Sequence, residues 1–293
     1  MLNKLISLFI SFIISFCNFF GIDAPVAKVL EFRDIAYGEH ERNTYNLYLP
    51  TGKETNGLVL LIHGGAWLGG DKGEFDSRLN EVSKEMGFAC AAVNYRFIND
   101  SIDLIDITDD IQLAVSHIKA LALENGVNLD KMLLSGGSAG GHLSMLYAYS
   151  RDEVSAIKPA AVVSYCGPTD LSDDAYYFDN GLGDGEYVAQ VLSWASGYKH
   201  TFASRSEAKD ALWNVSPLKY VDKNTVPTVI NHGMVDDIVP FSNAKALDEK
   251  MTEYGIGHIF NAYPNSGHGL NNDRFNETLA ESLFKMYIIK YLT

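Results

Sequence analysis

Cysteine and basic charge are both scarce in this chain of 293 residues. Its three cysteines, Cys17, Cys90 and Cys166, are odd in number and far apart, so their spacing matches neither a disulfide framework nor a metal-binding motif. Asp and Glu total 37 against 23 for Lys and Arg, which gives a formal net charge of -14. Because binding to nucleic acid needs a basic face and no basic run is present, we exclude a nucleic acid partner.

Long uncharged apolar runs are absent except at the N-terminus, where residues 5–22 lie between Lys4 and Asp23. This charge order favours a cytoplasmic N-terminus and an exported body. The run is longer than a typical signal core and short for a membrane span, and it shows no small-residue cleavage site. We predict that residues 1–25 are an export signal or a membrane tether, so that the body is secreted or held at the outer face of the membrane. The alternative is a packed helix of a cytoplasmic protein.

Residues 26–293 show no internal repeat and no low-complexity linker, so we predict a single domain. Short apolar runs alternate with helical spacing, which predicts an α/β fold with a mostly parallel sheet and helices on both faces. Sites in such folds form at the carboxyl ends of the strands. The predicted buried strands are 57–63, 88–96, 131–135, 160–165 and 227–231. We also predict an edge strand at 45–49, a last strand at 259–263, and helices at 105–123, 242–254 and 277–291.

Ser138 stands at the centre of a G-x-S-x-G pattern between a predicted strand and a helical run that starts near His142. A serine on a sharp strand-to-helix turn has unfavourable dihedral angles, and only very small residues fit two positions before and after it. Such a turn exposes the hydroxyl and places the N–H groups of the next helix beside it. We predict that Ser138 is a nucleophile, with an ordinary glycine turn as the alternative.

A serine nucleophile needs a base and a group that orients the base, and in this kind of sheet the chain order is serine, acid, histidine. After a predicted buried strand, the loop at 231–240 offers two adjacent carboxylates, Asp236 and Asp237. His268, flanked by glycines, follows the last predicted strand. We predict His268 as the base and leave the acid open between the two aspartates.

The other histidines have structural explanations. His63 and His232 end buried strands, so we expect them to hydrogen-bond to loop backbone groups. The side chain of His142, on the helix after Ser138, should point away from the serine. His40 and His200 lie in polar surface stretches.

A glycine-rich loop at 63–67 follows the first predicted buried strand. Backbone N–H groups in such a loop can stabilise an oxyanion without interference from side chains. We predict an oxyanion hole formed by the amides of Gly65, Ala66 and Ala139. The alternative is an ordinary strand-to-helix turn in which Trp67 anchors the core.

From about residue 45 to the end, the chain resembles the α/β-hydrolases, and within them bacterial carboxylesterases of the kind that includes feruloyl and acetyl-xylan esterases. The resemblance implies a serine esterase that needs no metal or organic cofactor, and it implies Asp236 rather than Asp237 as the acid. Hormone-sensitive-lipase-like esterases usually have HGGG and an Asp before the serine, where this chain has Ala66 and Gly137. The motifs that match are HGGAW at 63–67, GGSAGG at 136–141, HGMVDDIVP at 232–240 and SGHG at 266–269.

The predicted function is hydrolysis of short-chain or aromatic acyl esters, such as acetyl or feruloyl groups on plant polysaccharide, in a small-molecule or carbohydrate-linked substrate. Arylformamidases share a similar HGG-x-W loop, so an amide substrate is an alternative, as is a binding module without catalysis. The sequence leaves the oligomeric state open.

A long insertion at about 168–224 is rich in aromatic and acidic residues and is predicted to form a cap. Trp67, Tyr177 and Trp194 are predicted substrate contacts, although the aromatic residues of the insertion can equally form its own small core. Its aspartates disfavour anionic substrates.

Overall fold

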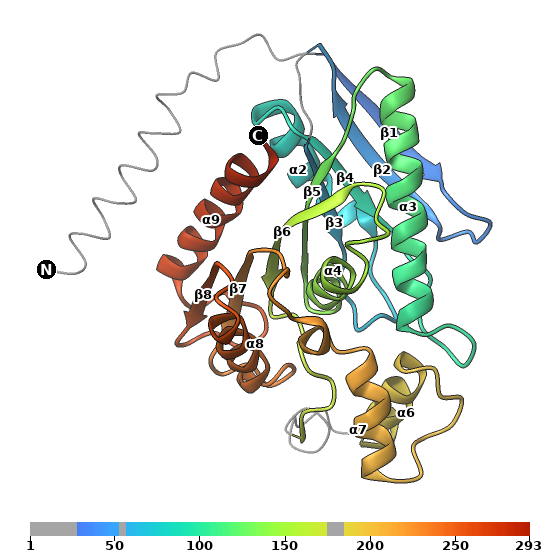
Figure 1. Cartoon of the computed structure of the whole chain (residues 1–293), viewed down its shortest axis with the longest axis vertical. Coiled ribbons are helices and arrows are strands. Elements are labelled where there is room, and N and C mark those ends of the chain that lie inside the picture. Colours follow the sequence, from blue (N-terminus) through green and yellow to red (C-terminus); the bar gives the residue numbers. More distant parts are fainter. Residues whose placement is uncertain (1–27, 53–56, 175–184) are drawn as a thin grey trace, which may run out of the picture.

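The computed structural model describes residues 28–52, 57–174 and 185–293. Within these ranges eight strands form one sheet in the order β1-β2-β4-β3-β5-β6-β7-β8 (Figure 1). β1, β2 and β4 pair antiparallel, and the remaining neighbours pair parallel. The strands are β1 (Val29–Ala36), β2 (Thr44–Pro50), β3 (Gly57–Ile62), β4 (Ala89–Val93), β5 (Lys131–Gly137), β6 (Lys158–Tyr165), β7 (Thr228–Gly233) and β8 (His258–Tyr263).

Helices cover both faces of the sheet (Figure 1), as the alternating pattern predicts. One apolar core lies under α3, α4 and α8, and a second lies under α2 and α9. The helices on the sheet are α2 (Asp76–Asn80), α3 (Leu104–Glu124), α4 (Ala139–Ser150), α8 (Phe241–Glu253) and α9 (Arg274–Leu292), with short helical turns at Lys72–Phe75, Glu81–Glu85 and Pro217–Tyr220.

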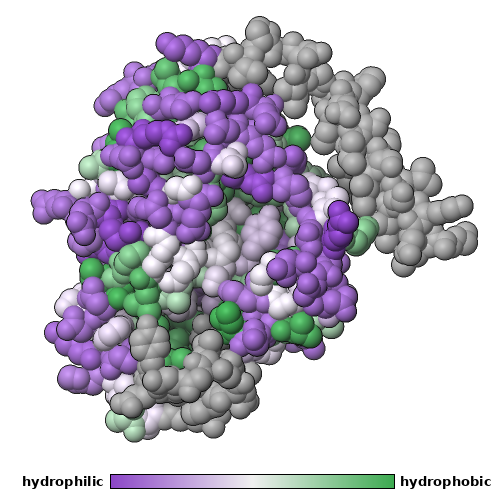
Figure 2. Space-filling model, turned by 180° about the vertical axis from the view of Figure 1, so that it is seen from behind, coloured by the Kyte–Doolittle hydropathy of each residue, from purple (hydrophilic) through white to green (hydrophobic). Residues whose placement is uncertain are grey.

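The central strands are buried on both faces because their side chains point alternately into the two cores. In β3, Leu58, Leu60 and Ile62 enter the core under α3 and α4, whereas Val59 and Leu61 enter the core under α9. This arrangement explains why the strand is a continuous apolar run. The face of the protein shown in Figure 2 is largely hydrophilic, and its apolar residues form smaller patches in the upper and lower parts of the view.

The prediction of an edge strand at 45–49 is wrong, because β2 lies inside the sheet between β1 and β4. Asn46, the polar residue within this segment, is only 5% exposed. Its Oδ1 accepts a hydrogen bond from the Asp34 N–H at 2.9 Å, where the β1–β2 register is irregular. The strand that forms this edge of the sheet is β1, which mixes apolar with charged residues and was not predicted.

The other predicted strands and helices are present, with boundaries shifted by a few residues. The boundary that matters most for the site is the start of α4, which is Ala139 rather than near His142. The helix therefore begins directly after Ser138. The predicted insertion lies between β6 and β7 and contains α6 (Gly185–Ala195) and α7 (Arg205–Asn214).

The N-terminal segment 1–25, predicted to be an export signal or tether, lies outside the described residues. Among the helices that the structure does describe, none is long and apolar enough to cross a membrane.

Candidate active site

Ser138 forms a sharp turn between β5 and α4, with φ of 53° and ψ of -124°. Its N–H donates to the Tyr165 carbonyl oxygen at 2.8 Å, which ties the turn to the end of β6. A Cβ at either Gly136 or Gly140 would collide with the Ile62 carbonyl oxygen. The glycines on both sides of the serine are therefore required by the close approach of β3, and the strained serine is held in place by its surroundings.

The glycine loop after β3 lies beside this serine. A Cβ built at Gly64 would be 3.6 Å from the Cβ of Ser138. The Leu68 N–H donates to the Gly65 carbonyl oxygen at 2.9 Å, which closes a tight turn. Ala66 and Trp67, the central residues of this turn, have φ of 51° and 60°, as a type I′ turn requires. Left-handed backbone at two consecutive non-glycine residues is costly, so the surrounding structure must hold this turn.

The amides predicted to bind an oxyanion have no competing acceptor. Among the described residues, neither the Gly65 N–H nor the Ala66 N–H donates a hydrogen bond. Ala139 is the first residue of α4, so its N–H has no acceptor within the helix. Ala139 directly follows Ser138, and the glycine loop that carries the other two amides lies beside the serine turn.

Asp236 is the aspartate that contacts His268. Its carboxylate is fully buried, and its Oδ2 lies 2.9 Å from the Nδ1 of His268. Its Oδ1 accepts hydrogen bonds from the N–H groups of Ile238 and Val239, both at 2.9 Å. Asp237, by contrast, is exposed. Burial alone would raise the pKa of Asp236, but the hydrogen bonds from His268 and from the two amides outweigh it and hold the pKa below its ordinary value.

His268 lies on the loop after β8, and its side chain is 21% exposed. Nδ1–H of His268 donates a hydrogen bond to the carboxylate of Asp236. In this tautomer Nε2 carries no hydrogen and is the acceptor. Within the described ranges, this Nε2 has no hydrogen-bond partner. A neutral imidazole oriented by a buried carboxylate is suited to take a proton.

Two backbone contacts join the loop of the acid to the loop of the histidine. The Met234 N–H donates to the Tyr263 carbonyl oxygen at 2.9 Å, and the Val235 N–H donates to that of Ser266 at 3.3 Å. Gly233 allows this approach, because a Cβ there would collide with the carbonyl oxygens of Ser266 and Gly267. The side chain of Ser266 donates to Asp273 at 2.7 Å and anchors the histidine loop to the start of α9.

Two residues beside Asp236 were not expected there from the sequence. His232 has its Nε2 at 3.5 Å from Oδ2 of Asp236, and Cys166 is buried with a φ of 48°. Their ligand atoms and that of Asp236 lie within 4.8 Å of one another. However, the Nε2 of His232 donates to the Val239 carbonyl oxygen at 2.9 Å, and burial raises the pKa of the Cys166 thiol. A metal ligand needs a free nitrogen lone pair on histidine or a thiolate on cysteine. The Nε2 of His232 and the thiol of Cys166 offer neither, so we interpret these residues as structural neighbours of Asp236.

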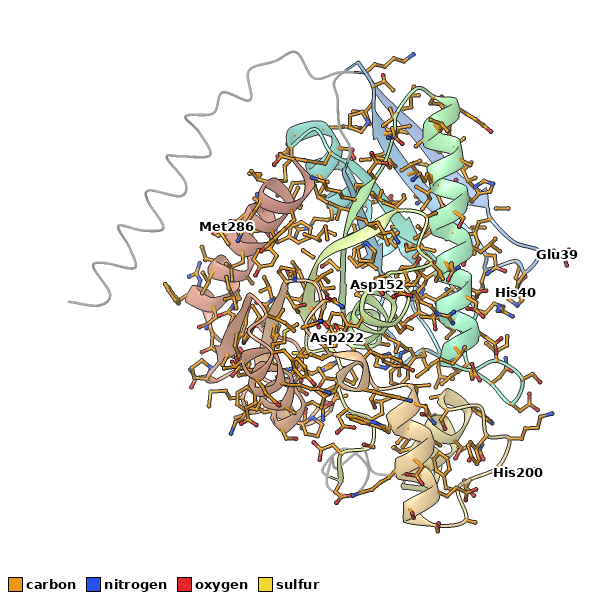
Figure 3. All side chains as sticks on the ribbon, in the orientation of Figure 1. Glu39, His40, Asp152, His200, Asp222 and Met286 are labelled. Atoms are coloured by element: carbon orange, nitrogen blue, oxygen red, sulfur yellow. The ribbon has the colours of Figure 1, made fainter. Side chains whose placement is uncertain are left out.

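The remaining histidines occupy structural positions, as predicted. His63 donates from Nδ1 to the Gly64 carbonyl oxygen at 2.8 Å, and His232 bonds to loop backbone as described. The Nε2 of His142 donates to the Val215 carbonyl oxygen, and burial lowers the pKa of this ring to about 4. His40 and His200 are exposed at the periphery of the molecule (Figure 3).

The predicted substrate contacts have different positions. Trp67 is 2% exposed and packs edge-on against His142, so its position matches the core-anchor alternative and not a contact with substrate. Tyr177 lies outside the described residues. Trp194, on α6, lines a hollow of about 230 Å³ against the segment between β4 and α3, together with Asp103 and Lys199.

Comparisons with known proteins agree with this fold. Among curated proteins, a probable isoprenylcysteine alpha-carbonyl methylesterase, ICMEL1 of Arabidopsis thaliana, is 27% identical over 238 residues, covering 76% of this chain and 48% of that protein. LipM of Mycobacterium tuberculosis, a probable carboxylic ester hydrolase, is 26% identical over 235 residues, which cover 75% of this chain and 51% of the LipM chain. The chain thus spans about half the length of these relatives.

Solved structures show the same architecture. A truncated carbohydrate esterase from gut microbiota superposes with a TM-score of 0.69 at 20% identity, covering 89% of this chain and 98% of that one. An inhibited Esterase B from Lactobacillus rhamnosis also has a TM-score of 0.69 at 20% identity, and the match covers 99% of this chain and 96% of that one. Residues 45–251 match the model of the BD-FAE family. The chain therefore belongs to the BD-FAE family and has the α/β-hydrolase fold.

Proposed function

We propose that the protein is a serine carboxylic-ester hydrolase with a triad of Ser138, His268 and Asp236. The observation that supports this most directly is the 2.9 Å hydrogen bond between Asp236 and His268. These residues follow β7 and β8, at the same edge of the parallel strands as the strained Ser138 turn after β5. Among the described residues, no hydrogen bond joins Ser138 to His268. The Ser138 N–H contacts the end of β6, and the Cys166 N–H donates to the Asn231 carbonyl oxygen on β7. Backbone contacts thus connect the serine turn to the loop of the acid.

The mechanism begins when Nε2 of His268 takes the proton of the Ser138 hydroxyl as its oxygen attacks the ester carbonyl carbon. Asp236 keeps the ring in the tautomer that leaves Nε2 free, and it stabilises the imidazolium that forms. The imidazolium then donates its proton to the leaving alcohol, and an acyl-enzyme remains. In deacylation, His268 takes a proton from water as the water oxygen attacks the acyl carbon. The imidazolium then returns this proton to the Ser138 oxygen as the carboxylic acid is released.

The amides of Gly65, Ala66 and Ala139 stabilise the oxyanion in both tetrahedral intermediates. Such donors act on charge that exists only in the transition state and the intermediate, so they raise kcat rather than tighten substrate binding. Loss of one donor of this kind costs about 10²- to 10³-fold in kcat in well-studied hydrolases.

The substrate class that we propose is a short-chain or aromatic acyl ester, with acetyl or feruloyl esters of plant polysaccharide as the leading candidates. The named esterase relatives and the carbohydrate esterase of similar fold support an ester over an amide. The formal net charge of -14 disfavours anionic substrates. Trp194 on α6 offers an aromatic surface at the hollow beside the insertion.

The test is hydrolysis by the full chain of a p-nitrophenyl ester series from acetate to palmitate, together with acetylated xylan and methyl ferulate. We expect preferred release of acetate or ferulate, complete inhibition by a serine-reactive phosphonate, and a loss of at least about 10⁴-fold in kcat for Ser138→Ala. Near-normal turnover by Ser138→Ala would disprove the assignment of Ser138 as the nucleophile. Turnover of formamides but not of esters would disprove the substrate class.

A further inference from the structure

His63 is a buried ring with a defined partner on each nitrogen. Its Nδ1 lies 2.8 Å from the Gly64 carbonyl oxygen, and its Nε2 lies 3.3 Å from Nη2 of Arg42. A carbonyl oxygen only accepts and a guanidinium only donates, so Nδ1 carries the hydrogen and Nε2 is the bare acceptor. The two partners therefore select one neutral tautomer of His63.

Arg42 is itself held firmly, although it comes from the distant connection between β1 and β2. Its Nε donates to the Tyr95 carbonyl oxygen at 2.9 Å, and its Nη2 donates to the Gly70 carbonyl oxygen at 3.0 Å. The guanidinium lies 3.7 Å from the centre of the Phe97 ring, within the range of a cation–π contact. Arg42 thus presents a fixed donor to His63.

The Gly64 carbonyl is the group that these contacts orient. Besides His63, the Tyr95 hydroxyl reaches it at 3.4 Å and reaches the His63 carbonyl oxygen at 2.9 Å. Gly70 makes room for this arrangement, because a Cβ there would collide with Nδ1 of His63. Without such contacts, the peptide between Gly64 and Gly65 would rotate easily, since glycine tolerates many backbone angles.

The carbonyl of Gly64 and the N–H of Gly65 belong to the same peptide unit. In a planar trans peptide these two groups point in opposite directions. Holding the carbonyl oxygen toward His63 and Tyr95 therefore directs the Gly65 N–H the other way. Rotation of this peptide would instead turn a carbonyl oxygen toward the place where the oxyanion forms, and the negative charge would be repelled.

We propose that Arg42 and His63 are positioning residues for the oxyanion hole. Arg42 keeps His63 in its Nδ1–H form, His63 holds the Gly64 carbonyl, and the Gly65 N–H is thereby directed at the oxyanion. This inference rests on the proposed ester hydrolysis and adds two residues that do not touch the substrate. Burial, and then Arg42, lower the pKa of His63, so the ring stays neutral at about pH 7.

Two substitutions of His63 separate the functions of its two nitrogens. In His63→Asn the side-chain amide nitrogen can occupy the place of Nδ1 and still donate to the Gly64 carbonyl. In His63→Gln the amide extends to the place of Nε2 and loses that donor. We expect kcat to fall roughly tenfold to a hundredfold in His63→Gln, with KM changed by less than about threefold, and to stay within about threefold in His63→Asn. An equal fall of kcat in both variants, or a change of KM with kcat unaltered, would overturn the proposal.

Arg42→Met tests the outer part of the same arrangement. It should lower kcat by roughly tenfold in the wild-type background and by much less in His63→Asn, where no ring tautomer is left to select. Crystal structures of Arg42→Met and His63→Gln should show the Gly64–Gly65 peptide rotated. An unrotated peptide in both variants, or equal losses from Arg42→Met in both backgrounds, would contradict the proposal.

The ¹⁵N chemical shifts of the wild-type His63 ring give a measurement that does not depend on turnover. A protonated Nδ1 and a bare Nε2 at about pH 7 support the positioning pair, and the opposite tautomer overturns it. If the wild-type protein failed to hydrolyse esters, the proposed function would fall, while the ring shifts and the variant structures would still decide whether Arg42 and His63 orient the loop.

Discussion

The Nδ1 atom of His268 lies 2.9 Å from Oδ2 of Asp236, and these residues lie on loops that follow neighbouring parallel strands. The other carboxylate oxygen accepts hydrogen bonds from two backbone N–H groups, so both oxygens of the carboxylate are held in place. A buried carboxylate with every oxygen engaged is a rigid partner for a histidine that must keep one tautomer through the reaction.

The adjacent aspartates give a matched pair of variants. Asp236→Asn should lower kcat by about 10⁴-fold, because the asparagine amide can stabilise the wrong tautomer of His268. Asp237→Asn should leave kcat within about twofold, since Asp237 is exposed. Steady-state hydrolysis of p-nitrophenyl acetate by both variants measures this. If Asp237→Asn were the inactive variant, the assignment of the acid would be wrong.

The lowered pKa of Asp236 also predicts how stability depends on pH. A carboxyl group whose pKa is lower in the folded than in the unfolded state stabilises the fold above its unfolded pKa of about 4, and this contribution is lost as the pH falls through the folded value. Urea unfolding between about pH 6 and pH 3 should therefore show a smaller loss of stability for Asp236→Asn than for the wild type. Asp237→Asn removes an exposed carboxyl group at the neighbouring position and is the control for the change in net charge. If the free energy of unfolding fell with pH at the same slope in all three proteins, the lowered pKa of Asp236 would be contradicted.

Substitution by alanine at the two neighbouring glycines of the serine turn should change stability by very different amounts. In Gly136→Ala the new methyl group meets the Ile62 carbonyl oxygen, so we expect a loss of at least about 2 kcal/mol in the free energy of unfolding. In Gly137→Ala the nearest atom is the Tyr165 carbonyl oxygen at 3.8 Å, so stability should change by less than about 1 kcal/mol. Chemical denaturation of both variants measures the difference. Similar losses at both positions would show that the close approach of β3 does not require Gly136.

Trp194 provides a test of the proposed aromatic substrates. If its ring contacts the acyl group or the sugar, Trp194→Ala should lower kcat/KM for methyl ferulate by about threefold to tenfold relative to p-nitrophenyl acetate. Trp213→Ala is a suitable control, because Trp213 lies on α7 and contacts Lys250. An unchanged ratio in Trp194→Ala, or the same change in both variants, would indicate that Trp194 only packs within the insertion.

Much of the site could be predicted from sequence because its signals are local. The glycines around Ser138 report a tight turn within five residues, and Asp236 and His268 each follow a buried strand directly. The order of strands and helices follows from the periodicity of apolar residues. The position of Ser138 between β5 and α4 was therefore predictable without knowledge of the neighbours of either element.

The features that were missed depend on contacts between distant segments. Trp67 is in the core because α4 brings His142 against it, and Cys166 and His232 meet Asp236 because β6 and β7 are neighbours. The place of β2 inside the sheet depends on its pairing with β1 and β4, which the residues of β2 alone do not show.

The sequence by itself determined the α/β class, the serine turn and the order of the candidate triad, since turn geometry and strand burial act over a few residues. Only the tertiary structure decided which aspartate contacts His268 and which rings are buried. It also brought Arg42, from the edge of the sheet, to the loop after β3. The physical reason is that hydrogen bonds and packing act between neighbours in space, and the order of strands in the sheet decides which distant residues become neighbours.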